Sequence, residues 1–366
     1  MHGTSAALPW ERGTVHGRAS LATLPRTLWA ARTVTTVALR LECVDLADES
    51  AGALAQVRSL VTAANWTRMP SAPFAVRAER RGQHPFRSPE LASVVGATVI
   101  DAVRRRTGRR LPVNLDEPVT EVRVELDGRR LRVGYDLAGT SLHRRWWQAA
   151  HHHAGLRPSA AAALLAYAGW ADGEALLDPM TGGGTVPIEA GLIALRRPPR
   201  HGALPRLQAL GLDDAELSRQ TAADLVAAHR TPGPLPIRGL ELYPSHVATA
   251  RANQASAGLT GALRIDRGDA TVMAGIDQLD RLVANPPYGL RAGSPRMLAP
   301  LYDGLLARTA ERLTPDGRAV VLTPAARVLR EAADKAGLAI EDERAITLGK
   351  LDVRAFRLTH PGSLVQ

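Results

Sequence analysis

Four short stretches in the second half of the sequence carry side chains whose types and spacing could do chemistry. The first is LLDPMTGGGTVPIEAG, residues 176–191, where an apolar strand ends at Asp178 and a glycine loop leads into a helix. Glycines let a ligand approach the backbone, and a helix N-terminus offers free N–H groups. The spacing does not match a dinucleotide-binding loop, and the lysine of a phosphate-binding loop is missing. An acid at Asp178 would repel a pyrophosphate and suits a ligand that carries an ammonium group and a sulfonium.

Two further acids follow the next two expected strands. Glu241 ends the strand expected at residues 237–242, where a carboxylate can accept hydrogen bonds from both hydroxyls of a ribose. Asp269 follows the short strand at residues 263–266 and can take an adenine amine, with the backbone of Ala270 beside it. Each acid alone is also compatible with a solvated loop.

The fourth stretch is Asn285-Pro286-Pro287-Tyr288, which ends the apolar run at residues 282–284. Folding alone does not require this combination. The Asn285 side chain and the Pro286 carbonyl are two acceptors on a stiff backbone, because each proline fixes φ. Two acceptors suit an exocyclic NH₂ group, and Tyr288 offers a face on which a base can stack. The arrangement would orient an amine toward a methyl donor by proximity and electrostatics.

The elements that must position these residues alternate between strands and helices, which predicts a parallel sheet with helices on both faces. Strands are expected at residues 175–179, 237–242, 263–266, 282–284 and 318–323, followed by an antiparallel pair at 339–348 and 353–358. In the first half, strands are expected at 34–41 and 74–81, helices at 50–63 and 89–106, and a hairpin joins 119–126 to 131–137. Residues 196–236 interrupt the rhythm and are expected to form a surface insertion with a helix at 213–229.

Charge is distributed unevenly along the 366 residues, whose formal net charge is +10. Residues 1–150 carry 22 Lys and Arg against 14 Asp and Glu, and the remainder carries 24 against 22. A basic excess on one part indicates a polyanion partner, here nucleic acid. No apolar run is long enough to span a membrane, and no secretory signal is evident. The single cysteine, Cys43, fits a reducing cytoplasm, where we expect the protein.

The order of these motifs resembles that of class I S-adenosylmethionine-dependent amino-methyltransferases. Residues 74–86, 111–126 and 139–145 are similar to the THUMP-containing RNA methyltransferases, of which members with this layout methylate the exocyclic N2 of guanosine in tRNA or large-subunit rRNA. The resemblance implies an α/β protein: a C-terminal Rossmann-like class I methyltransferase domain after an N-terminal α+β THUMP region. It implies a ferredoxin-like subdomain at 1–65, THUMP at 66–145, a linker at 146–158 and the methyltransferase at 159–366, with the insertion 196–236.

By the same resemblance, S-adenosylmethionine would be the cofactor and Asn285, Pro286, Pro287 and Tyr288 would hold the guanine amine. The residues expected to line the cofactor are Ser159, Asp178, Pro179, Met180, Thr181, Gly182, Gly184, Glu241, Leu242, Asp269, Ala270 and Asn285. The loop departs from the family, which often has Cys-Gly-Ser-Gly where this chain has Thr181-Gly-Gly-Gly184. Smaller residues should leave the loop competent to bind the cofactor, and the loss of a hydroxyl is expected to act against binding.

Arginine clusters predict where RNA would be held. The expected RNA-binding residues are Arg80, Arg81, Arg104, Arg105, Arg106, Arg109, Arg144 and Arg145. Trp146 and Trp147 are compatible with stacking on RNA and equally with packing between domains. Three adjacent histidines, His151 to His153, do not present a tetrahedral set and have no cysteine partner, so no metal is expected.

The leading hypothesis is therefore guanine-N2 methylation of structured RNA, with the acceptor stem of tRNA favoured over rRNA. The sequence does not fix the oligomeric state, and a monomer is favoured. Other substrates for the same fold are adenine in DNA and a glutamine side chain, although the basic N-terminal half argues against a protein substrate. From another class, the chain would be an RNA assembly factor that has lost catalysis; the intact Asn285 to Tyr288 motif argues against it.

Overall fold

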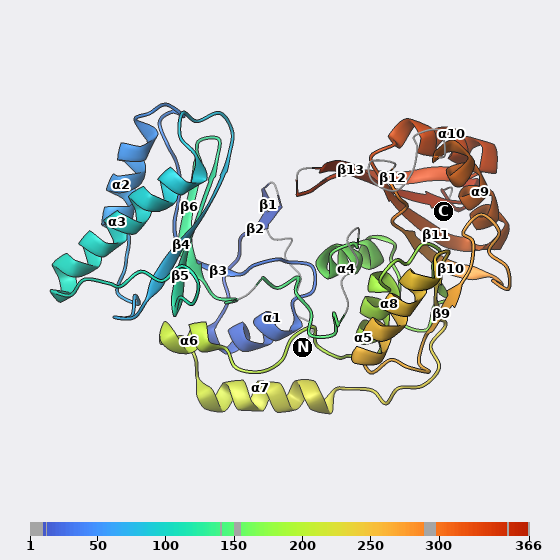
Figure 1. The fold of residues 1–366 in the computed structure, drawn as a ribbon, viewed down its shortest axis with the longest axis horizontal. Coiled ribbons are helices and arrows are strands. Elements are labelled where there is room, and N and C mark those ends of the chain that lie inside the picture. The colour runs from blue at the N-terminus through green and yellow to red at the C-terminus, as the bar shows by residue number, and fades with distance from the viewer. Residues whose placement is uncertain are drawn as a thin grey trace. The chain divides into compact units, whose positions relative to one another are not determined.

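The computed structural model describes residues 10–11, 13–139, 141–149, 155–288, 298–349 and 351–364 (Figure 1). The chain divides into two compact units. The N-terminal unit comprises Met1–Ala30, Thr36–Ser141 and His201–Asp224, and the C-terminal unit comprises Ala31–Thr35, Leu142–Arg200 and Leu225–Gln366. The boundary that we drew at residue 65 therefore runs through the N-terminal unit.

The N-terminal unit is built on a four-stranded sheet with strand order β3-β6-β5-β4. Its main elements are β3 (Ala38–Asp45), α2 (Ala53–Ala63), β4 (Phe74–Arg81), α3 (Ser88–Thr107), β5 (Thr120–Asp127) and β6 (Arg130–Asp136). Strands β4 and β5 run parallel, and the hairpin β5–β6 is antiparallel, as expected from the alternation of its residues. Strand β3 begins later than predicted because its pairing with β6 starts with Ala38 opposite Asp136.

Shorter elements complete this unit and include most of the sequence insertion. They are β1 (Trp10–Glu11), β2 (Thr14–Val15), η1 (Leu21–Thr23), α1 (Leu24–Ala30), α6 (Pro205–Ala209) and α7 (Ala215–Ala227), the last of which extends beyond the unit's boundary. Leu207, Leu210 and Leu212 are buried, and the Trp29 indole N–H donates to the carbonyl of Gly202 at 3.1 Å. Residues 201–224 of the insertion therefore belong to the N-terminal unit, whereas 196–200 and 225–236 belong to the C-terminal unit.

The C-terminal unit contains a seven-stranded sheet with the order β12-β13-β11-β10-β7-β8-β9. Its strands are β7 (Leu176–Asp178), β8 (Ile237–Glu241), β9 (Arg264–Arg267), β10 (Leu279–Ala284), β11 (Leu313–Thr323), β12 (Ala339–Leu348) and β13 (Leu351–Thr359). The first five pair in parallel, and β13 pairs antiparallel with β11 and β12. Both features were predicted from the sequence and are confirmed.

Helices cover both faces of this sheet, as predicted (Figure 1). They are α4 (Pro158–Tyr167), α5 (Thr185–Ala194), α8 (Pro244–Ser256), α9 (Leu298–Arg312) and α10 (Ala326–Ala336), and a 3₁₀ turn, η3 (Pro361–Leu364), follows the last strand. Helices α4, α5 and α8 contribute to one apolar core, and α9 and α10 contribute to the other. Among the described helices, none combines the length and the hydropathy needed to span a bilayer.

Strand order locates the place where a ligand would bind. From β7, the chain proceeds to β8 and β9 on one side and later to β10 and β11 on the other. Ligands of open α/β sheets bind beyond the carboxyl ends of the strands where the order reverses. The four motifs all lie at the carboxyl ends of β7, β8, β9 and β10, so the sheet brings them to one edge.

Candidate active site

Asp178 ends β7 and is 3% exposed. Its Oδ1 accepts a hydrogen bond from the Met180 N–H at 3.2 Å. Burial raises the pKa of the Asp178 carboxyl to about 7, and the Met180 hydrogen bond offsets part of that rise. The described residues supply no ion pair to this carboxylate. The charge of the ionised carboxyl is therefore not compensated by a cation within the described structure.

The glycine loop after β7 is held by hydrogen bonds from its neighbours. The Thr181 N–H donates to the Leu240 carbonyl at 2.9 Å, and the Asn253 side-chain amide donates to the Gly183 carbonyl at 2.9 Å. Gly184 has φ +83°, and a Cβ there would lie 3.2 Å from atoms of Ala250 and Ile188. The Thr181 side chain is buried beside the Asp178 carboxyl, and its hydrogen bond acts to lower the pKa of that group. The loop is therefore held by its neighbours and places a hydroxyl next to the buried acid.

Asn253 is a site residue that the sequence analysis missed. It lies on α8, where Val247, Ala250, Asn253 and Gln254 form the buried face. An amide on the apolar face of an amphipathic helix must find a partner, since a buried polar group without a hydrogen bond is costly. That pattern is the signal that could have identified it.

Glu241 ends β8 next to Asp178. Its Oε2 accepts the Gly182 N–H at 3.0 Å, and its Oε1 accepts the Tyr243 N–H at 3.0 Å. The His246 Nδ1 lies 3.4 Å from the Glu241 Oε1. Each carboxylate oxygen has a second lone pair, so Glu241 can support the loop and also accept hydrogen bonds from a diol. Leu242, the next residue, is exposed.

Asp269 follows β9 and is exposed, whereas the neighbouring Ala270 is buried. Its Oδ1 accepts hydrogen bonds from the Thr271 N–H at 2.8 Å and the Thr271 hydroxyl at 2.7 Å. These contacts fix the turn and direct the carboxylate. Ser159 is buried in the first turn of α4, and none of the described hydrogen bonds joins it to the loop after β7; its role stays a prediction.

Asn285 follows β10, which pairs in parallel with β7. Leu282 lies opposite Leu177, so Asn285 lies two residues beyond the level of Asp178. The Tyr288 hydroxyl donates to the Asn285 Oδ1 at 2.6 Å. Burial, followed by the nearby Tyr302, raises the pKa of Tyr288, so the phenol remains a donor. Pro286 is buried and Pro287 is exposed. The amide is thus oriented, with a lone pair left on its oxygen.

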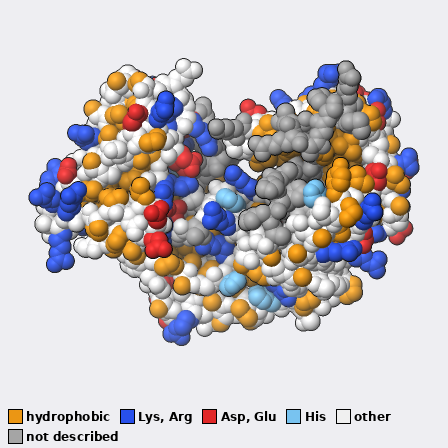
Figure 2. Space-filling view, viewed as in Figure 1, with side chains coloured by type: hydrophobic (Ala, Val, Ile, Leu, Met, Phe, Trp, Pro, Cys, Tyr) orange, Lys and Arg blue, Asp and Glu red, His pale blue; other side chains and the backbone are white. Residues whose placement is uncertain are grey.

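The proposed RNA residues of the N-terminal unit lie mostly at its surface. Figure 2 shows Lys and Arg side chains gathered at the end of this unit where α3 ends. Arg104, Arg105 and Arg109 are exposed, and Arg106 is exposed while it donates to the Trp66 carbonyl at 2.7 Å. Figure 2 and these exposures describe a basic surface that solvent or a polyanion can reach. Of the other candidates, Arg81 and Arg144 are exposed and Arg80 is half-buried, donating to the Gly82 carbonyl at 2.6 Å.

Arg145 is a correction to the sequence analysis. Its side chain is 0% exposed, and its Nε lies 2.9 Å from the Oε1 of Glu189, which is also fully buried. Arg32 approaches the same carboxylate at 3.3 Å. A guanidinium enclosed in this way cannot reach an RNA phosphate, so the RNA-binding role predicted for Arg145 is wrong.

The two tryptophans of the predicted linker differ in burial. Trp147 is buried in the core of the C-terminal unit, which answers the question of stacking or packing for this residue, and Trp146 is 43% exposed. His151 to His153 lie outside the described residues. Within the described ranges, no cluster of three or more His, Cys, Asp or Glu side chains could hold a metal ion.

Comparisons with known proteins agree with this geometry. Residues 145–354 match the model of an RMKL-like methyltransferase domain, and residues 53–136 match that of a THUMP domain. The chain is similar to the tRNA (guanine(6)-N2)-methyltransferase of Archaeoglobus fulgidus, with 36% identity over 76% of this chain and 67% of that protein. It is also similar to the ribosomal RNA large subunit methyltransferase K/L of Photobacterium profundum, with 33% identity over 58% of this chain and 31% of that protein. The crystal structure of TrmN from Thermus thermophilus superimposes with a TM-score of 0.65 at 28% identity, covering 90% of this chain and 84% of that one.

Proposed function

The chain belongs to the family of RMKL-like methyltransferases that carry a THUMP domain, and from this premise we propose that it methylates the exocyclic N2 of a guanosine in structured RNA, with tRNA as the substrate. One observation carries the proposal: the carboxyl ends of four neighbouring parallel strands bring Asp178, Glu241, Asp269 and Asn285 to one edge of the sheet. Three of these positions are carboxylates, and the fourth is an oriented amide.

The residues present fit S-adenosylmethionine, which when bound supplies a methyl group activated by a sulfonium. Asp178 is a buried carboxylate without an ion pair and would bind the ammonium of the methionine part. The Thr181 hydroxyl lies beside Asp178 in the same loop and would hydrogen-bond the carboxylate end of that part. Glu241 would accept the ribose hydroxyls, and Asp269, beside buried Ala270, would accept the adenine amine.

Asn285 and Pro286 would hold the guanine amine. The Asn285 Oδ1 retains one lone pair beyond the bond from Tyr288, and the Pro286 carbonyl supplies a second acceptor. Two acceptors for two N–H donors leave the nitrogen lone pair directed at the methyl donor, so the residues act by orientation and electrostatics. The Tyr288 ring offers a stacking face for a base that has left its helix.

The N-terminal unit would grip the RNA by its backbone and shape, through the exposed arginines at the end of α3. One point favours tRNA. The similarity to a named tRNA enzyme covers 76% of this chain, whereas the similarity to a named rRNA enzyme covers 58%. Because the chain is also similar to a named rRNA enzyme, large-subunit rRNA is the second candidate substrate.

Transfer of radiolabelled methyl from S-adenosylmethionine to unmodified tRNA and, separately, to unmodified rRNA tests the proposal. Nucleoside analysis should find N2-methylguanosine in tRNA, and the Asn285→Ala variant should give no label while it still binds the cofactor. Label in rRNA alone would show that rRNA, the second candidate, is the substrate. Label in neither RNA, with intact cofactor binding, would reject the proposed RNA substrates and favour either a substrate other than RNA or an assembly factor that has lost catalysis.

A further inference from the structure

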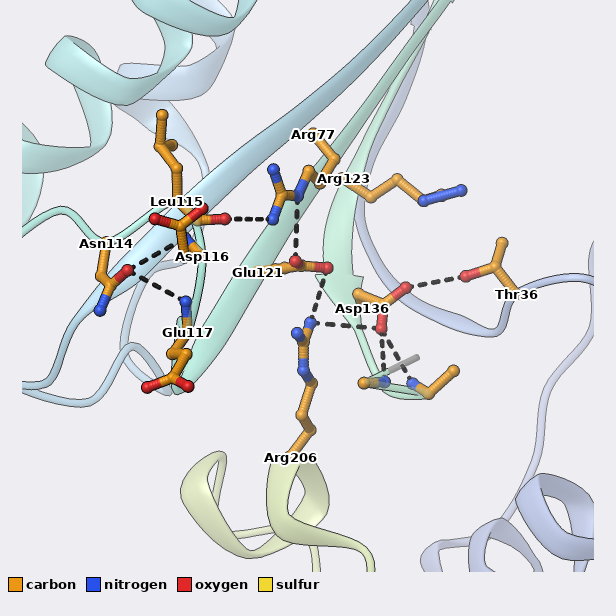
Figure 3. Close-up of polar contacts among 12 residues, drawn as sticks. Thr36, Arg77, Asn114, Leu115, Asp116, Glu117, Glu121, Arg123, Asp136 and Arg206 are labelled. Atoms are coloured by element: carbon orange, nitrogen blue, oxygen red, sulfur yellow. Dashed lines mark hydrogen bonds and ion pairs between the residues drawn. The ribbon is translucent and has the colours of Figure 1, made fainter. Parts of the chain in front are cut away.

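Asp136, at the end of β6, collects hydrogen bonds from three separate parts of the chain (Figure 3). Its Oδ2 accepts the Thr36 hydroxyl at 2.8 Å. Its Oδ1 accepts the N–H groups of Ala138 and Gly139 at 3.0 and 2.8 Å, and the Arg206 Nη1 at 3.3 Å. All of these residues belong to the N-terminal unit, and the Asp136 carboxylate is buried.

The three parts are those through which the chain enters or leaves this unit. Thr36 is the first residue after the short segment 31–35 of the C-terminal unit. Ala138 and Gly139 lie just before the chain leaves at Ser141, and Arg206 follows the return at His201. One carboxylate therefore ties three of the connections between the units to the end of a single strand. We call Asp136, Arg206 and their partners the Asp136–Arg206 junction.

Arg206 has a second anion within reach. Its Nη1 lies 2.9 Å from the Oε2 of Glu121 on β5, and its own side chain is 7% exposed. Burial acts to raise the pKa of Glu121, but the hydrogen bonds and charges of Arg206 and then Arg77 outweigh it, so the pKa is lowered. The Arg77 Nε donates to the other oxygen of Glu121 at 3.0 Å (Figure 3).

The packing around Arg206 leaves it little freedom. Gly139 has φ +77°, and a Cβ at that position would lie 3.5 Å from the Arg206 Nε, so the Arg206 side chain lies beside the exit turn. Arg68 donates to the carbonyls of Leu210 and Gly211 at 3.3 and 3.2 Å and anchors the far end of the same segment. A buried cation held by two carboxylates is strongly destabilised when one partner is removed, because the remaining charges lose their compensation.

Replacement of Arg206 should therefore remove the contacts of residues 201–212 with Asp136 and Glu121 while the four-stranded sheet stays folded. The β5–β6 hairpin has its own backbone pairing, and Glu121 would retain Arg77. Asp136 would keep its hydrogen bonds from Thr36 and from the exit turn. The RNA-facing arginines at the end of α3 and the cofactor residues of the C-terminal unit have no described contact with Arg206.

We propose that the Asp136–Arg206 junction is a positioning element for RNA methylation, and that it fixes the connecting segments so that RNA held by the N-terminal unit reaches the catalytic residues. The proposal rests on the RNA methyltransferase function above. Arg206 acts through the segments that it orders and does not touch the reacting groups. Looser connections lower the effective concentration of the target at the catalytic site without changing either binding surface.

Arg206→Met tests the junction, with Arg219→Met as the matched control. Arg219 belongs to the same inserted segment, but its side chain is 74% exposed and pairs with Glu216 within α7. In Arg206→Met, the equilibrium affinities for tRNA and for S-adenosylmethionine should stay within about twofold of the wild type, while turnover with both at saturation falls by about 10-fold or more. Arg219→Met should match the wild type, and Arg206→Lys, which keeps the charge, should recover most of the turnover.

Amide hydrogen exchange supplies the structural readout. In Arg206→Met, protection should fall together in residues 36–40, 137–139 and 202–212, and it should be unchanged in Arg219→Met. Unaltered saturating turnover would overturn the proposal, as would a loss confined to tRNA affinity, which would make Arg206 part of the RNA surface. If the wild type methylates neither RNA, the proposed function fails, and the exchange result still decides whether the junction ties the three segments.

Discussion

Asp178→Asn should stabilise the cofactor-free protein and weaken cofactor binding at the same time. The carboxyl ends β7 in a buried position, and burial raises its pKa from 3.8 to about 7. The folded protein therefore holds the proton more tightly than the unfolded chain does. The penalty for ionising the group in the folded state is absent below pH ~4, grows as the pH rises, and is complete above pH ~7.

The size of the effect follows from the shift. Each pKa unit corresponds to about 1.4 kcal/mol, so the penalty is on the order of 4 kcal/mol at pH 8.5 and about 2 kcal/mol at pH 5. Asparagine has nearly the same shape and can keep the hydrogen bond from the Met180 N–H through its Oδ1. The variant should therefore be more stable than the wild type by a few kcal/mol at pH 8.5, and by clearly less at pH 5.

Urea unfolding at the two pH values, without cofactor, measures this difference. Calorimetry with S-adenosylmethionine supplies the second half of the test. Wild-type affinity should fall below pH ~7, because the carboxyl must release its proton to pair with the ammonium, and Asp178→Asn should bind weakly with little pH dependence. If the wild type and Asp178→Asn are equally stable at pH 8.5, the ionised Asp178 carboxyl does not destabilise the folded protein, and the reasoning is refuted. An unchanged pH slope of cofactor affinity in the variant would remove Asp178 from the ammonium site.

The remaining predictions concern the other motifs. Tyr288→Phe keeps the ring but loses the hydroxyl that orients Asn285, so turnover should fall about three- to tenfold, the worth of one hydrogen bond, with unchanged RNA affinity; wild-type turnover would show that the amide needs no such support. Asn285→Ala should abolish methylation and keep most cofactor affinity, and normal turnover would reject its role. Glu241→Ala should weaken cofactor binding in calorimetry, whereas equal affinity would move the ribose contact elsewhere. Replacing Arg104 to Arg106 with Ala should flatten the salt dependence of RNA affinity, and an unchanged slope would exclude that cluster from the RNA surface.

Local patterns predict the catalytic fold well because each one is decided within a few residues. The apolar run at the end of β10 lies in the core, and the glycine loop after β7 requires the backbone that Gly184 adopts. Parallel pairing then brings the strand ends together without further information, which is why Asp178, Glu241 and Asn285 were expected at one edge and are found there.

The extent of the N-terminal unit could not be read in the same way. Strand β3 belongs to it because its pairing partner, β6, lies far along the chain, and residues 201–224 belong to it because their leucines and Arg206 find a core there. The hydrophobic pattern of a segment predicts which of its faces is buried but not which part of the fold covers that face. The insertion at 196–236 was predicted from the alternation of strands and helices, and the boundary at residue 65 from the resemblance to the family. Neither source carries information on such long-range pairing.

Arg145 and Arg206 suggest how a buried cation differs in sequence from one at the surface. The exposed arginines at the end of α3 stand in a dense basic cluster, which would be prohibitively repulsive in a core. Arg206 instead lies among Leu204, Leu207 and Leu210, and the partner of Arg145, Glu189, is the one charged residue of the apolar helix α5. A single charge within an apolar run needs an opposite charge from elsewhere in the fold. Arg145 was predicted to bind RNA because it adjoins Arg144. Its burial is explained instead by its partner Glu189, which lies 44 positions away in the sequence.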